Sequence, residues 1–129
     1  MAVEMRFARI SIDSPGYTAQ DITSAVAALV QEQKLINGIV TLYAVSPRTM
    51  VVLTEYEPEL LKDLEELIRS LESKSIAVAE ALLGKETSAP VVKGSLEMGS
   101  FKNFVFIDLS HKPGEKEVVV ILEGVFKGG

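Results

Sequence analysis

The stretch LYAVSPRTMVVLTEYEP, from Leu42 to Pro58, contains an apolar run that ends at Val45, a short polar link and a second apolar run over residues 49–54. β-branched residues favour strands, and proline is favoured at the first position of a helix. The stretch therefore predicts a strand, a tight connection, a second strand and the start of a helix. Functional residues are often carried by such connections, but this one holds no histidine, cysteine or pair of carboxylates.

Upstream of this stretch, apolar periodicity predicts one further strand and one helix. Over residues 3–12 the apolar positions change phase, which implies a bulge or a strand buried on both sides. Thr18 and Asp21 have the spacing of a capping box, and the pair predicts the start of a helix. The helix would bury one face, formed by Ile22, Ala25, Val26, Leu29 and Val30. The dipeptide Asn37–Gly38 predicts a link that ends before a central strand over 39–45.

Downstream, the sequence predicts two more helices followed by three or four strands. A leucine-rich stripe extends from Pro58, and "SKSIAVAEALLG" predicts a third helix that ends at Gly84. Short strands are expected at 91–92 and 95–98. Strands over 103–109 and 117–125 are expected to form an antiparallel hairpin through "SHKPGEK". Because the helices are grouped rather than alternating with strands, the order predicts an α+β fold with mainly antiparallel sheets.

Composition limits the classes of function. The 129 residues suit one domain over 1–129, and 47% hydrophobic residues are enough for a core. The net charge of -5 argues against nucleic acid or an anionic membrane as a partner. The chain has no cysteine, no leader-like start and no apolar run near the roughly 20 residues of a membrane span. We expect a cytoplasmic protein.

The residues with chemical potential each have a plainer interpretation. His111 is the single histidine and lies in a polar loop, where a solvated side chain is expected. Glu55, Glu57 and Glu59 offer oxygen ligands to a cation, but they also suit the positive end of a helix dipole. Gly94 and the other loop glycines match no phosphate-binding fingerprint and suit turns.

Together, four stretches resemble the YjbQ family, also called secondary thiamine-phosphate synthase. They are "DITSAVAALVQEQKLINGIVTLY", "LTEYEP.LLKDLEELI", "KEVVVILEG" and the segment from Leu82 to Phe101, which has the pattern LLG-x5-PV-x-KG-x-L-x-x-G-[TS]-[WF]. They extend from about residue 10 almost to the end of the chain. The resemblance implies a two-sheet β-sandwich with three helices and assembly as a homotrimer.

The chain departs from the family where the family carries its histidines. Ser46–Pro47–Arg48 stands at the family's His-Thr-Thr, and Thr54–Glu55–Tyr56 stands at its Asn-Glu-Asn. Ala77 replaces a histidine, Gly99–Ser100–Phe101–Lys102 replaces Gly-Thr-Trp-Gln, and Lys116 or Glu117 replaces an arginine. With neither histidine ligands nor thiolates, no tight transition-metal site and no cofactor are expected.

The positions that match the family motifs give the candidate site. We expect it to bind a small anionic or phosphorylated metabolite, because Arg48 and Lys102 would supply positive charge and Glu55 would pair with one of them. The equally weighted alternative is that both cations lie apart in solvent. The function expected is a non-catalytic or small-anion-binding homotrimer, and the alternative is an enzyme with weak thiamine-phosphate-synthase-like or other phosphorylated-metabolite activity at a rebuilt site. The predicted site residues are Ser46, Arg48, Glu55, Ser100, Lys102 and Lys116.

Overall fold

The strand β8 lies inside the larger of two antiparallel sheets in the computed structural model, which describes residues 2–72 and 75–128. The five-stranded sheet has the order β1-β8-β3-β5-β6, and the three-stranded sheet has the order β2-β7-β4. The strands are β1 (Glu4–Ser14), β2 (Thr18–Asp21), β3 (Leu35–Ala44), β4 (Thr49–Thr54), β5 (Glu86–Val92), β6 (Ser95–Leu96), β7 (Asn103–Asp108) and β8 (Gly114–Phe126).

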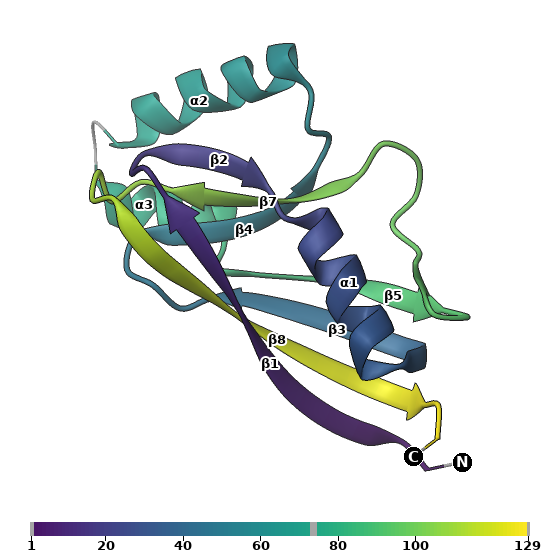
Figure 1. The fold of residues 1–129 in the computed structure, drawn as a ribbon. Helices are drawn as coiled ribbons and strands as arrows, with labels where there is room; N and C mark the ends of the chain where they lie inside the picture. Colours follow the sequence, from purple (N-terminus) through teal and green to yellow (C-terminus); the bar gives the residue numbers. More distant parts are fainter. Residues whose placement is uncertain (1, 73–74, 129) are drawn as a thin grey trace.

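The elements form layers around the three-stranded sheet (Figure 1). One face of this sheet, with α1 (Thr23–Gln33) beside it, covers the inner face of the five-stranded sheet. Its other face is covered by α2 (Pro58–Glu72) and α3 (Ile76–Leu83). Side chains of β7 alternate between the two layers: Phe104 and Phe106 enter the larger core, while Val105 and Ile107 pack toward α2 and α3. In the described part of the chain, no helix covers the outer face of the five-stranded sheet.

These observations confirm the predicted α+β fold with two antiparallel sheets and three helices. The strand over 49–54 and the helix starting at Pro58 are found as predicted. The third helix begins at Ile76 after the cap Ser75, whose side chain accepts from the Ala77 amide, and it ends before Gly84. Part of its predicted first turn, residues 73–74, lies outside the described residues. None of the helices in the described part of the chain has the length and apolar character of a bilayer span.

The predicted bulge in the first strand is wrong. β1 pairs with β8 in continuous register from Glu4 opposite Gly124 to Ser14 opposite Gly114. Its side chains alternate regularly, with even positions toward the core and odd positions outward. The apparent phase change arises because Met5 and Phe7 are apolar residues on the exposed face. In the sequence, their alternation looks the same as that of a second buried face.

The predicted capping box is also wrong. Thr18 and Asp21 belong to β2, which pairs with β7, so their backbone groups serve a sheet instead of a helix. The helix starts at Thr23, whose amide and hydroxyl both donate to the Asp21 carboxylate, at 3.0 and 2.6 Å. The predicted apolar face is confirmed in part: Ile22, Val26 and Val30 are buried and Leu29 is half-buried, whereas Ala25 is exposed.

β7 and β8 do not form the predicted hairpin. β7 pairs with β2 and β4, whereas β8 pairs with β1 and β3, so the "SHKPGEK" segment crosses between sheets. The prediction failed because the same turn residues suit a hairpin and a sheet-to-sheet crossing. The crossing is fixed by Asp108, whose carboxylate accepts from the Ser110 amide at 2.8 Å.

The Asn37–Gly38 dipeptide, predicted as a link, lies inside β3 beside an irregularity between Leu35 and Asn37. Gly38 is paired with Gly124 of β8, and the two backbones approach closely there. A Cβ placed on Gly38 would lie 1.9 Å from the Glu123 carbonyl oxygen, so no side chain fits without a backbone shift.

Candidate functional site

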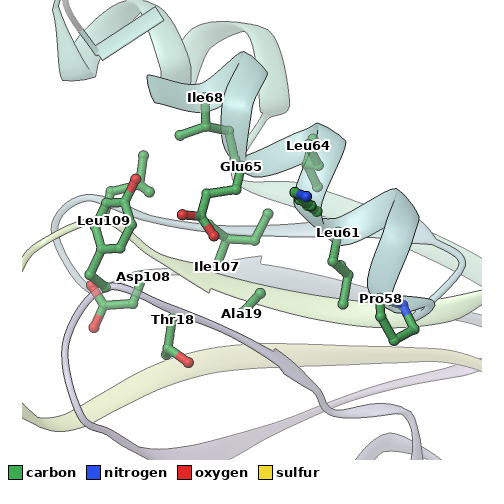
Figure 2. Close-up of a pocket in the computed structure, with 12 residues that line it drawn as sticks. Thr18, Ala19, Pro58, Leu61, Leu64, Glu65, Ile68, Ile107, Asp108 and Leu109 are labelled. Carbon is green, nitrogen blue, oxygen red and sulfur yellow. The ribbon is translucent and has the colours of Figure 1, made fainter. Parts of the chain in front are cut away.

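A cleft of about 280 Å³ lies between α2 and the three-stranded sheet (Figure 2). Leu61, Glu65 and Ile68 face the sheet from the helix, opposite Ala19 and Ile107 (Figure 2). The volume is near the lower end for small-molecule sites, and apolar walls with a few polar groups are typical of such sites. The lining residues are Tyr17, Thr18, Ala19, Pro58, Leu61, Lys62, Leu64, Glu65, Ile68, Ile107, Asp108 and Leu109.

Polar groups at one end of the cleft are tied to one another. The Tyr17 ring stacks on His111 with 4.3 Å between ring centroids, and the Arg69 guanidinium lies 5.8 Å from the Tyr17 ring centroid. Burial and the nearby Glu72 carboxylate raise the pKa of the Tyr17 phenol, so the neutral hydroxyl is favoured. The Glu65 carboxylate accepts from Arg69 at 2.7 Å. This end of the cleft therefore presents a paired charge and a neutral hydroxyl.

Asp108 forms part of the wall and is fully buried. Its carboxylate accepts from the Ser14 hydroxyl at 2.6 Å and from the Ser110 amide at 2.8 Å, and the Lys116 ammonium lies 3.8 Å away. Burial alone would raise the pKa of the Asp108 carboxyl. The hydrogen bonds from Ser14 and Ser110, together with the Lys116 charge, outweigh burial and hold that pKa below its usual value. Asp108 is thus an ionised carboxylate that is already satisfied.

Three of the six predicted site residues lie at this end of the three-stranded sheet. Lys116 is the partner of Asp108, and the Arg48 carbonyl accepts from the amide of Leu109, a lining residue, at 2.9 Å. Ser46 serves the backbone: its hydroxyl accepts from the Glu117 amide at 2.9 Å, and its carbonyl accepts from Lys85. Ser46 and Lys116 therefore have structural partners, while the Arg48 side chain is exposed.

The other three predicted residues, Glu55, Ser100 and Lys102, lie at the opposite end of that sheet. Thr54 pairs with Asn103 there, whereas Thr49 pairs with Asp108 at the first end. At a rise of about 3.3 Å per residue, the seven steps from Lys102 to Leu109 span about 23 Å. The structure therefore does not gather the six residues into one cleft within a single chain. A shared site between subunits stays a prediction.

The plainer interpretations of the other candidates fare better. The Glu57 carboxylate accepts from the Glu59 and Leu60 amides at 3.2 and 3.0 Å, which confirms its helix-terminus role at the start of α2. His111 is exposed, as expected, although it stacks on Tyr17. Among residues 2–72 and 75–128, no three His, Cys, Asp or Glu side chains are grouped to hold a metal ion.

Sequence reasoning missed the residues that build the cleft. Asp108 follows a run of apolar residues, and in the sequence a carboxylate at that position is indistinguishable from an ordinary polar residue at the end of a strand. The available signal was a single carboxylate after four apolar residues, followed two positions later by Ser110. Tyr17 has a φ of 49°, in the left-handed region, and no local sequence signal marked it as a lining residue.

The fold and the cleft define a class of two-sheet α+β proteins, and comparison with solved structures gives the same class. A YbjQ-like protein of unknown function from Sulfolobus solfataricus P2 superposes with a TM-score of 0.86 at 21% identity, covering 96% of this chain and 100% of that one. A hypothetical protein from Aeropyrum pernix K1 gives a TM-score of 0.82 at 22% identity, covering 93% and 99%. At these identities the likeness shows the fold.

Sequence comparison then identifies the family. The family model described as UPF0047 protein YjbQ-like matches residues 8–124, and the chain belongs to this family. A UPF0047 protein from Methanothermobacter thermautotrophicus is 24% identical over 117 residues, covering 81% of each chain.

Proposed function

We propose that this YjbQ-family chain is a non-catalytic protein that assembles into a homotrimer and binds a small anionic or phosphorylated metabolite. The observation that carries the proposal is the apolar outer face of the five-stranded sheet. Met5 and Phe7 of β1 have 54% and 67% of their surface exposed, and Val3, just before β1, has 73% exposed. Large exposed apolar patches on soluble proteins mark association surfaces.

The register shows that this apolar face extends across several strands. Phe7 pairs with Ile121 of β8, and Met5 lies in the same row as Ile39 of β3, with Glu123 between them. Tyr43 continues the face beside Val119. Ile39 and Tyr43 are themselves large exposed hydrophobic residues. Burying such a face against another copy of the chain would be favourable by the hydrophobic effect.

The anion-binding part of the proposal is supported by exposed cations. Arg48 and Lys102 have exposed side chains, and within the described part of the chain neither forms a salt bridge. An unpaired guanidinium or ammonium is available to a carboxylate or phosphate. In a homotrimer, Arg48 of one subunit and Lys102 of another would lie close together at a subunit interface and share one anion.

Light scattering after size exclusion tests the assembly. At micromolar concentration we expect about 42 kDa, three times the 14.0 kDa chain, and a mass of one chain would refute the proposal. Phe7→Glu should shift the mass toward one chain, because it places a charge inside the apolar face. Leu82→Glu is the matched control, since Leu82 is equally exposed but lies on α3 and should leave the mass unchanged.

A further inference from the structure

A second cavity, of about 570 Å³, lies at the C-terminal end of α1, away from the cleft under α2. Three lysines from three parts of the chain line it: Lys34 after α1, Lys93 between β5 and β6, and Lys127 after β8. Val30, Leu35 and Ile36 provide apolar wall. Among the described residues, the lining contains no Asp or Glu. We propose that this cavity binds a small phosphorylated molecule through the three ammonium groups.

Hydrogen bonds of the main chain, to other main-chain groups and to side chains, fix the three lysine positions. The Lys127 amide donates to the Lys34 carbonyl at 2.9 Å, which joins two of them directly. The Lys93 amide donates to the Asn37 side chain at 3.0 Å, and the Gln31 side-chain amide donates to the Gly94 carbonyl at 2.9 Å. The place where each lysine leaves the backbone is therefore fixed, while its long side chain is free to adjust.

The conformations of two of these lysines are unusual. Lys34 and Lys93 have φ values of 62° and 51°, in the left-handed region that residues other than glycine seldom occupy. Both belong to the lining of the same cavity. Glycine or asparagine would suit these turns better, so local backbone preference does not explain lysine at either position.

The three lysines have no ion-pair partner within residues 2–72 and 75–128, although the chain as a whole has a net charge of -5. Complementing the negative end of the α1 dipole is the ordinary role for cations here. That role is already filled by Arg6, whose guanidinium donates to the Gln33 carbonyl at 3.0 Å. A bound anion accounts for three additional cations around one cavity.

The chemistry of the lining selects the class of ligand. Lysine ammonium groups are compact point charges that bind phosphate without the planar geometry that arginine imposes on carboxylates. The volume lies within the usual range for small-molecule sites. A phosphate or diphosphate group would contact the lysines, and an attached organic part would lie against Val30, Leu35 and Ile36. This inference rests on one part of the proposed function, the binding of an anionic metabolite. It does not depend on assembly into a homotrimer.

Calorimetric titration with inorganic pyrophosphate at low ionic strength tests the site. The triple variant Lys34→Gln, Lys93→Gln, Lys127→Gln should lose affinity by about tenfold or more, because three charge-assisted contacts are removed. The control is Arg9→Gln, Lys112→Gln, which removes positive charge at exposed positions outside the cavity and outside the predicted site and should stay within about twofold of wild type. A separate variant, Arg48→Gln, Lys102→Gln, reports on the site predicted from the sequence.

Each outcome bears on a different claim. Equal losses in the triple variant and in the control would show charge attraction without a site and would overturn the inference. Loss in Arg48→Gln, Lys102→Gln alone would also overturn it, yet would keep the anion-binding function at the site predicted from these two residues. Absence of binding to wild type would overturn both. If the triple variant does not fold, NMR chemical shifts of the wild-type protein decide. Adding pyrophosphate should shift the signals of the Gly94 backbone amide and the Gln31 side-chain amide, and unchanged signals would refute the site.

Discussion

Replacing Asp108 with asparagine should destabilise the fold by about 3 kcal/mol at neutral pH. The carboxylate accepts from the Ser14 hydroxyl and the Ser110 amide, and hydrogen bonds to charged groups contribute about 1.5–3 kcal/mol against about 0.5–1.5 for neutral ones. Two weakened bonds therefore lose about 2 kcal/mol. The Lys116 side chain is only 13% exposed, and losing its counter-charge destabilises the fold by about 1 kcal/mol more.

The pH dependence supplies a second readout for the same change. The pKa of Asp108 is lowered in the folded protein from the ordinary 3.8. A depressed pKa gives stability that is fully present above the unfolded value and is lost as the pH falls through the folded value. The stability gap between wild type and Asp108→Asn should therefore be largest at neutral pH and narrow below pH 3.8.

Urea unfolding followed by far-UV circular dichroism measures both quantities. Protein concentration must be fixed, because assembly adds to apparent stability. Asp13→Asn is the control, since Asp13 lies on β1 near Ser14 but is exposed, and it should change stability by less than about 0.5 kcal/mol. If Asp108→Asn has no larger effect than this control, the buried carboxylate does not stabilise the sheet crossing and the reasoning fails.

Three further changes test the packing. Gly38→Ala should lower the unfolding free energy in chemical denaturation by about 3 kcal/mol or more, because the added Cβ meets the Glu123 carbonyl. Gly99→Ala is the control and should lower it by only about 1 kcal/mol, because its φ of +80° is strained for alanine but the space around it is open. Equal losses would contradict the close approach of the two backbones at Gly38. Ser75→Ala should remove the α3 cap and lower the unfolding free energy by about 1 kcal/mol, and an unchanged midpoint would argue against that cap. Ile68→Ala should lower the unfolding free energy by about 2–5 kcal/mol, because Ile68 is buried, and Leu67→Ala by less than about 0.5 kcal/mol, because Leu67 is exposed. The reverse order would show that α2 packs on another face.

Local patterns predicted the fold class, whereas strand partners required long-range information. The α2 stripe and the β-branched run at 49–54 are periodic signals contained within their own segments. β2 (Thr18–Asp21) has no such signal, because it is a strand through pairing with β7, far away in sequence. The crossing after Asp108 failed for the same reason, since a short turn-rich link does not state which strand each end will pair with.

The candidate site was predicted less well than the fold. Motif positions identified Arg48 and Lys102 as charged residues near strand ends, but their sequence positions could not show that the ends are opposite. Asp108 was missed because its role depends on Ser14, 94 residues away. The three lysines of the second cavity are also far apart in sequence, by 34 to 93 residues, and no window of local periodicity contains them together.

The pairing of β1 with β8 has a consequence for how the protein folds. Glu4 pairs with Gly124, and β3 also requires β8 as its neighbour, so the larger sheet has a high contact order. During synthesis β1 emerges early and remains without its partner until residues 114–126 have been made. Met5 and Phe7 are then displayed on a strand with two free edges, a state prone to intermolecular pairing. Folding should therefore be slow, and chaperones that hold short apolar segments should find their target in β1.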